Sequence, residues 1–548
     1  MTGCMLAVIV PMTNDTRTIL LMVFLGFLVG ALLFCLFLGP EQDHADVFYR
    51  GRGQSTLFSA VLAMVGVCLP ASTLLGMTGT ISLFGYDGMF IALSVLFALA
   101  LLLILARPLR RRGRFTIGDV CAQHTQGRAP RVAAGIVTLA VCLPLLMFEL
   151  ASAGINTALL LGFAGSGARS VFTIMIGVLI VSATVFGGMR GATALQIVKG
   201  VVLFAACAAV VILVMKHFGF NPGALLQSAR SHSYRPEAFL SQGMSTVPRA
   251  SDAVGAADFV GLQVTIILGL AGMPHVVMRI NALSDDATAA SVVCRVMYVV
   301  AAFMAGTVVM GLGAAALVGS ERIISADTGG AGALMLLSAS LAGGPSSAGG
   351  AAVFILVACA LFVTVLAATA SVTLAAAAAV AHDISPHTYG KRQSEGSEVA
   401  AAQWAAAIVG TAAIALAVAA RNENIQQLTA IALSIAASSL LPALVYSLFW
   451  REYTHRGLLW TLYGGMGATL ALLLFSPRVS GVPSSLFPSW HLDWFPLENV
   501  ALVSAPVGFL LGYLATVLGR PGRGRRSSRR MMTEPVDGVG QDHLRRTT

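Results

Sequence analysis

Long apolar segments alternate with short polar ones along almost the whole chain. About 13 of these segments are long enough, at roughly 18 residues or more, to cross the ~30 Å hydrocarbon core of a bilayer as helices. They cover about residues 18–39, 57–84, 88–106, 132–161, 170–187, 192–215, 256–274, 292–318, 350–381, 399–420, 425–449, 457–475 and 499–518. The pattern predicts an all-α integral membrane protein with about 13 transmembrane helices. The ten-residue alternation of a membrane barrel is absent.

Composition agrees with this class. The 548 residues are 57% hydrophobic and only 11% charged, with a mean hydropathy of +0.83, which leaves too few charges to cover a soluble surface of this size. The eight cysteines form no CxxC pair and mostly lie inside apolar segments, so they are expected to be small buried hydrophobes rather than a disulfide or zinc framework.

Basic residues predict the orientation of the chain. An odd number of helices puts the termini on opposite sides, and most of the 34 Lys and Arg residues fall on one side if the N-terminus is outside. This assigns to the cytoplasm the cluster Arg107 to Arg131, the segment with Arg190 and Lys199, and the basic tail 520–548. The segment 18–39 has no preceding basic region and no cleavage site, so residues 1–40 are expected to hold a retained extra helix in the cell membrane. The tail is expected to serve topology, with contact to anionic lipid headgroups as the alternative, and nothing supports binding to nucleic acid.

Two of the apolar segments are interrupted by glycine and proline. In 66–79, GVCLPASTLLGMTG, Pro70 has no N–H to donate and so frees the carbonyl of Gly66 at membrane depth. In 256–274, Gly269, Gly272 and Pro274 come in close order. These interrupted helices open two sets of five spans, about 57–215 and 256–449, within a core of 41–519 that adds two helices at 457–518. Interrupted helices at corresponding positions of two oppositely oriented halves are typical of an inverted-repeat transporter.

Polar side chains at membrane depth are candidates for a solute site. Glu149 and Asn156 share a helical face, and a carboxylate inside a span is costly unless it is paired or protonated. Ser72, Thr73 and Gln263 lie on the two interrupted helices. These five residues are the predicted substrate-binding set, although a neutral Glu149 that merely bonds a neighbouring helix is an equal alternative. Substitution of Glu149 by glutamine is expected to alter pH dependence or substrate choice.

Several stretches, in order, carry a resemblance to a known family. They are DVFYRGRGQS (46–55), LLGMTGTISLFGYDG (74–88), RRRGRFTIGDV (110–120), FGGMRGATALQIVKG (186–200), GLAGMPHVVMRINALSD (269–285), TLAAAAAVAHDI (373–384), NENIQQLTAIALSIAASSLLPALVYSLFW (422–450) and THRG (454–457). Together they resemble the sodium:solute symporters, and most closely their cation-acetate symporter branch.

The resemblance implies a LeuT-type 5+5 inverted repeat in which the first helix of each repeat is discontinuous. It also implies sodium-coupled uptake of a small solute, with no cofactor other than the coupling ion. The sodium ligands it implies are carbonyls and a hydroxyl at Gly66, Leu69, Ala367, Ala370 and Ser371. Many relatives have a hydroxyl residue where this chain has Ala370, and acetate-type relatives have small polar residues at Leu69 and Pro70. Because of these departures, coupling to protons is an alternative to coupling to sodium, and the identity of the solute stays open.

The function expected from the sequence is secondary active symport of a small organic solute, most simply a monocarboxylate such as acetate. Proline, pantothenate or a sugar is the alternative solute, and a membrane sensor derived from the same fold is a weaker alternative. An enzyme is not expected, because His124, His275 and His382 lie at span ends without HExxH or Ser-His-Asp logic. The expected partners are the solute, sodium and membrane lipid.

Overall fold

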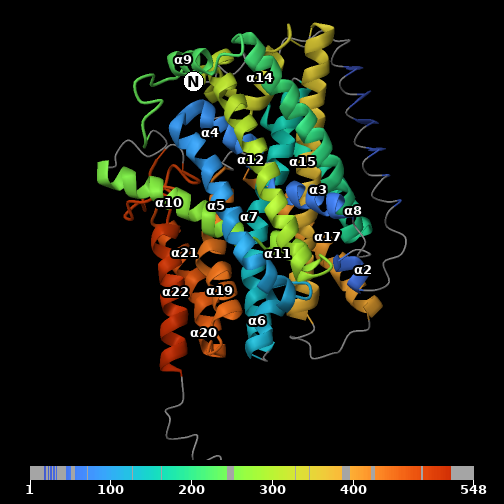
Figure 1. Ribbon diagram of the computed structural model, residues 1–548, viewed down its shortest axis with the longest axis vertical. Coiled ribbons are helices and arrows are strands. Elements are labelled where there is room, and N and C mark those ends of the chain that lie inside the picture. The colour runs from blue at the N-terminus through green and yellow to red at the C-terminus, as the bar shows by residue number, and fades with distance from the viewer. Residues whose placement is uncertain are drawn as a thin grey trace, which may run out of the picture.

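Helices make up nearly all of the structure, a computed structural model that is viewed in Figure 1 with its longest axis vertical. The structure describes residues 45–50, 56–70, 72–125, 128–161, 163, 165–243, 252–326, 329–344, 346–385, 395–420, 426–482 and 485–519, together with scattered helical positions between 18 and 37. The predicted tail 520–548 and most of the predicted helix 18–39 lie outside the described residues.

The first set of spans opens with a broken helix, as predicted. Helix α3 (Leu57–Cys68) ends just before Pro70, and the chain resumes as the π-helical segment η1 (Ser72–Gly76) and α4 (Met77–Phe84), at an angle of 57° to α3. Helices α5 (Tyr86–Arg112), α7 (Arg128–Leu160) and α8 (Ser166–His217) complete this set.

Helix α8 combines two of the predicted spans. Its 52 residues would extend about 78 Å if straight, far more than a bilayer needs. Gly188 interrupts it with φ 49° and ψ −151°, a left-handed conformation that glycine adopts without a Cβ penalty. The predicted segments 170–187 and 192–215 therefore lie on the two sides of this break.

The second set also opens with a broken helix. Helix α10 (Asp252–Ala271) stops at Gly272 and Met273, and α11 (Pro274–Asn281) begins at the proline, which suits the first position of a helix. The set continues with helices α12 (Asp286–Leu317), α15 (Ala348–Ala378) with its π-helical extension η2 (Ala379–Ile384), α17 (Glu395–Ala419), and α18 (Gln426–Ile435) followed by η3 (Ala436–Leu440) and α19 (Leu441–Phe449).

Ten helices of the described chain are long and apolar enough to cross a membrane, or eleven with the bent pair α3 and α4. After α19, the remaining spans are α20 (His455–Leu459) with η4 (Trp460–Gly464) and α21 (Gly465–Leu474), and then α22 (Ala501–Leu518). The multi-pass helical class is confirmed, whereas the total of 13 stays a prediction because segment 18–39 is not described as a whole.

Short helices cap the two ends of the bundle. Helices α6 (Ile117–Thr125) and α20 lie at the lower end in Figure 1, and α9 (Pro222–Ser231) and α14 (Ala333–Ser340) at the upper end. Two further short helices are α2 (Ala45–Arg50) and α13 (Ser320–Ala326). The basic cluster Arg107 to Arg131, which was assigned to the cytoplasm and contains α6, thus lies at the same end as α20. Which end faces the cytoplasm stays a prediction.

Arg478 ties the segment between α21 and α22 to the bundle. Its guanidinium donates to the carbonyl of Glu498 (3.0 Å), to the side-chain oxygen of Asn499 (2.7 Å) and to Gln427 of α18. Asn499 in turn donates its backbone N–H to the Asp258 carboxylate of α10 (2.8 Å). All of these side chains except Glu498 are nine-tenths or more buried, so the links are shielded from water.

We expect Arg478→Met to lower the free energy of unfolding by about 3 kcal/mol, because it leaves three oxygen acceptors, on two segments of the chain, without their charged donor. Thermal unfolding in detergent measures the loss. Arg230→Met is the matched control, since Arg230 bonds only the nearby Pro236 carbonyl on an exposed surface and its loss should cost well under 1 kcal/mol. Equal melting temperatures for the two variants would contradict the prediction.

Candidate functional site

A cavity of about 190 Å³ lies between the two broken helices. Its walls come from η1 and α4, from α5 and α7, from α10 and α11 around their break, and from α18. Eighteen residues line it: Pro70, Thr73, Gly76, Met77, Thr80, Ile91, Val95, Leu145, Phe148, Leu262, Thr265, Ile266, Leu270, Met273, His275, Thr429, Ala430 and Leu433. Both repeats therefore contribute to one mostly apolar site with a few polar groups, the usual composition of a small-molecule site.

The polar groups of this cavity divide into two kinds. The hydroxyls of Thr80 and Thr265 are used within their own helices, where they donate to the carbonyls of Gly76 (2.6 Å) and Gly261 (2.7 Å). In contrast, Nδ1 of His275 and Oγ1 of Thr429 are buried and have no hydrogen-bond partner among the described residues. Unpaired buried polar atoms are costly, so these two atoms mark where a bound polar molecule would be favoured.

The predicted substrate residues do not all reach this cavity. Thr73 lines it, whereas the side chain of Ser72 lies outside the described part of the chain. Gln263 accepts a hydrogen bond from Ser94 of α5 and donates weakly to its own helix at Phe259 (3.3 Å). Its amide thus links α10 to α5.

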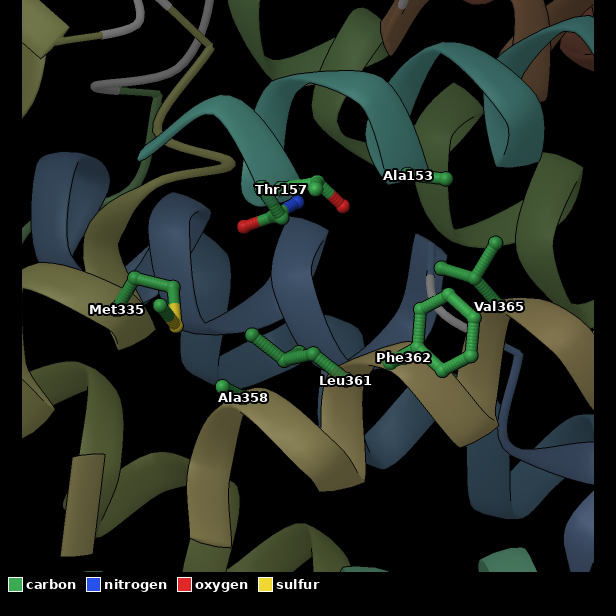
Figure 2. Close-up of a pocket in the computed structure, with 8 residues that line it drawn as sticks. Ala153, Thr157, Met335, Ala358, Leu361, Phe362 and Val365 are labelled. Atoms are coloured by element: carbon green, nitrogen blue, oxygen red, sulfur yellow. The ribbon is translucent and has the colours of Figure 1, made fainter. Parts of the chain in front are cut away.

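The other two predicted substrate residues lie deeper in α7. Glu149 is fully buried and follows Phe148 of the cavity wall. Asn156 lines a separate cavity of about 20 Å³ between α7, α14 and α15, too small for a solute beyond one water. Figure 2 shows Ala153 and Thr157 of α7 facing Leu361, Phe362 and Val365 of α15 across this small cavity.

Three of the predicted sodium ligands lie around two side chains of α8. The carbonyl of Gly66 accepts a hydrogen bond from Nζ of Lys199 (2.7 Å). Nε2 of Gln196 donates to the carbonyl of Ala367 and to Oγ of Ser371, both at 2.9 Å. The other two predicted ligands are also buried: Leu69 directly follows the last residue of α3, and Ala370 lies on α15 with Ala367.

Lys199 and Gln196 were not among the site residues predicted from the sequence. Lys199 was assigned to a cytoplasmic segment with Arg190, and that assignment is wrong, because the side chain is fully buried inside α8 and bonded to α3. The signal was present, since Lys199 interrupts an apolar segment long enough to span, and an ionisable residue inside a span is a functional candidate. Gln196, one helical turn earlier, lies on the same face.

A second polar cluster joins α6, α7, η2 and α17 near the end of the bundle that carries α6. The Asp119 carboxylate pairs with Arg131 (2.9 Å) and His382 (3.1 Å) and accepts the backbone N–H of Phe115 (2.8 Å). The other ring nitrogen of His382 contacts Glu398 (2.8 Å). Burial alone would raise the pKa of Asp119, but the hydrogen bond from His382, the charges of His382 and Arg131 and the N–H of Phe115 together hold it well below its usual value.

Three residues of this cluster are potential metal ligands. Donor atoms of Asp119, His382 and Asp383 lie within 4.8 Å of one another. However, both ring nitrogens of His382 face carboxylates and the cationic Arg131 already contacts Asp119, so the donor set is occupied by hydrogen bonds and a further cation is disfavoured. The arrangement is that of a buried ionic network linking four segments.

Comparison with known proteins places the chain in a family. The profile of the sodium:solute symporter family matches residues 48–465. The chain belongs to the sodium:solute symporter family. This symporter is 32% identical over 532 residues to the monocarboxylic acid transporter of Corynebacterium glutamicum, with 94% of both chains covered. It is also 32% identical over 501 residues to the uncharacterised symporter YwcA of Bacillus subtilis, covering 91% of this chain and 94% of the relative.

Solved structures show the same fold for this symporter. The substrate-bound outward-open state of a Na+-coupled sialic acid symporter matches 92% of this chain and 98% of its own, with a TM-score of 0.68 at 14% identity. MhsT in complex with L-phenylalanine matches 85% of this chain and 100% of its own, with a TM-score of 0.51 at 15% identity. The LeuT-type fold and the family resemblance are confirmed, and the family and its neighbours are transporters, not enzymes.

Proposed function

We propose that this symporter takes up a small monocarboxylate by alternating access through the cavity between its two broken helices. Membership of the family supports sodium-coupled solute symport in a multi-pass membrane protein. The monocarboxylate is favoured by the name of the Corynebacterium glutamicum relative, a monocarboxylic acid transporter, and by the chemistry of the cavity. We also propose the orientation with the N-terminus outside and the tail 520–548 in the cytoplasm of the cell.

The observation that carries the proposal is the pair of buried polar atoms without hydrogen-bond partners among the described residues, in a mostly apolar cavity. A carboxylate accepts hydrogen bonds, and Oγ1 of Thr429 and a protonated Nδ1 of His275 are the donors that it needs. His275 is the second residue of α11, whose N-terminus carries the positive end of a helix dipole that favours an anion. The apolar remainder of the solute would contact Phe148, Leu262 and Ile266.

The same cavity disfavours a sugar as the solute. A sugar carries several hydroxyls, each of which loses water on binding and needs a partner. The cavity offers only a few polar side chains, of which Thr80 and Thr265 already donate to their own helices. A solute with one charged group and a short apolar body matches this set better.

The coupling energy is of the right size for uptake. One positive charge that crosses a potential of 100 mV contributes about 2.3 kcal/mol, equivalent to nearly a fifty-fold concentration gradient of solute. The coupling ion acts only through its different affinities for the outward-open and inward-open states.

Uptake into proteoliposomes tests the proposal. Labelled acetate, pyruvate and proline are offered while a sodium gradient and a proton gradient are imposed separately. We expect accumulation of acetate or pyruvate above the level in protein-free liposomes, and none of proline. Accumulation of proline alone would contradict the monocarboxylate assignment.

The role of Thr429 gives a sharper test within the cavity. We expect Thr429→Val to raise the KM for the transported monocarboxylate about tenfold, because it removes one hydrogen bond to a charged group, worth roughly 1.4 kcal/mol, at nearly constant volume. Thr469→Val is the control, since that hydroxyl donates only to Gly465 of its own helix α21. An unchanged KM in Thr429→Val would show that the hydroxyl does not touch the solute.

A further inference from the structure

Lys199 lies where the family resemblance places a sodium ion. The carbonyl of Gly66 has no helical N–H to accept, because the residue four positions later is Pro70, and α3 ends at Cys68. Nζ of Lys199 donates a hydrogen bond to this carbonyl instead (2.7 Å), and the lysine side chain is fully buried. The residue one turn earlier, Gln196, donates to the carbonyl of Ala367 and the hydroxyl of Ser371 on α15. Two side chains of α8 thus make the contacts expected of an ion between α3 and α15.

We propose that the ammonium of Lys199 is a built-in cation that replaces sodium at the position formed by Gly66, Ala367 and Ser371. The inference rests on the proposed symport, because it concerns which position the coupling ion uses. A sodium ion coupled to transport in this protein then binds elsewhere.

Titratable groups of three neighbouring helices face Lys199. Glu149 of α7 is close enough for a negative charge on its carboxylate to act on Lys199. Cys68 of α3 and His275 of α11 are also titratable neighbours, and Arg279 of α11 donates to Thr193, which lies earlier on α8. Taken alone, the repulsion between this ammonium and a sodium ion about 4 Å away would weaken sodium binding at this position roughly a thousandfold.

Removal of the lysine should therefore create a sodium site. In Lys199→Ala the carbonyl of Gly66 loses its donor, and Oε1 of Gln196 is already without a hydrogen-bond partner among the described residues. These oxygens, with the hydroxyl of Ser371, are the hard ligands that sodium prefers. An ion that binds only the folded state raises its stability by mass action.

Thermal unfolding of the purified full-length protein in detergent, in sodium chloride against choline chloride, tests this inference without any solute. We expect Lys199→Ala to melt several degrees higher in sodium than in choline, a response that wild type lacks or shows less strongly. Adding Ser371→Ala to this variant should remove the gained response. Lys216→Ala, at the exposed end of α8, is the control and should respond as wild type does.

Two results would overturn the inference. One is a folded Lys199→Ala variant whose response to sodium equals that of wild type. The other is a rise in the melting temperature of wild type in sodium that Ser371→Ala alone abolishes, because sodium would then bind beside Lys199, at the position formed by Gly66, Ala367 and Ser371. If Lys199→Ala does not fold, the comparison of wild type with Ser371→Ala decides the question. An equal effect of sodium on the melting temperatures of these two proteins then supports the inference. Failure of monocarboxylate uptake would refute the proposed solute and leave these results unaffected.

Discussion

Asp119→Ala is expected to lower the free energy of unfolding by about 3–5 kcal/mol. Asp119 is almost fully buried, and one carboxylate oxygen pairs with Arg131 and His382 while the other accepts backbone N–H groups of Phe115 and Thr116. Its loss would leave cationic groups of α7 and η2 in a buried position without their shared counter-charge. The end of the bundle that carries α6 should then open locally.

Thermal unfolding and the yield of folded protein after detergent extraction measure this effect. Asp286→Ala is the matched control, because Asp286 also pairs with an arginine, Arg111 (2.6 Å), but that arginine side chain is 70% exposed. Exposed pairs contribute roughly 0–1 kcal/mol, so the control should unfold almost as wild type does. Similar losses of stability in Asp119→Ala and Asp286→Ala would show that burial does not strengthen the ion pairs of this network.

The pH dependence of the same network has a defined sign. The pKa of Asp119 is lower in the folded protein than in the unfolded chain, where it is about 4. The carboxylate therefore contributes stability at pH values above about 4, and this contribution is lost as the pH falls below that value. The difference in melting temperature between wild type and Asp119→Ala should be constant near neutral pH and shrink in acid.

The two broken helices could be predicted because their cause is local. Pro70 and Pro274 each lack an N–H, and glycines a few residues before them weaken the helix, so the sequence alone locates both breaks. The break at Gly188 also follows from a local cause, since two apolar segments meet there. The exact ends of helices depended on caps such as Asp285, whose carboxylate accepts the Thr288 N–H at 2.8 Å.

The contents of the site could not be predicted, because they depend on contacts between distant segments. Lys199 reaches Gly66 across 133 positions of the chain, and Gln196 reaches Ala367 across 171. The rule that basic residues mark the cytoplasmic side treats a lysine as a loop residue, and for Lys199 burial against α3 overrides it. Gln263 was predicted to bind solute, but its link to Ser94 depends on how α10 packs on α5.

Gly66→Ala is expected to lower the free energy of unfolding by about 2–3 kcal/mol and to reduce uptake more than tenfold. A Cβ at position 66 would lie 2.5 Å from Oε1, 2.8 Å from the backbone carbonyl and 2.9 Å from Cβ of Gln196. The side-chain oxygen can turn away, but the backbone of α8 cannot, so α3 and α8 must separate. The hydrogen bond from Lys199 to the Gly66 carbonyl lies at this crossing and would be strained with it.

The expected loss of stability in Gly66→Ala is opposite to the usual effect of a glycine-to-alanine change in a helix. An alanine in place of a helical glycine normally stabilises a helix by about 1 kcal/mol, and Gly467→Ala in α21 should do so, because nothing lies within 4 Å of its added Cβ. The two variants are therefore expected to shift the melting temperature in opposite directions. Uptake of labelled monocarboxylate, corrected for the amount of folded protein, should fall only in Gly66→Ala. A stabilised and active Gly66→Ala would mean that α3 and α8 are not in close contact during transport, and the proposed position of Lys199 between Gly66, Ala367 and Ser371 would lose its structural basis.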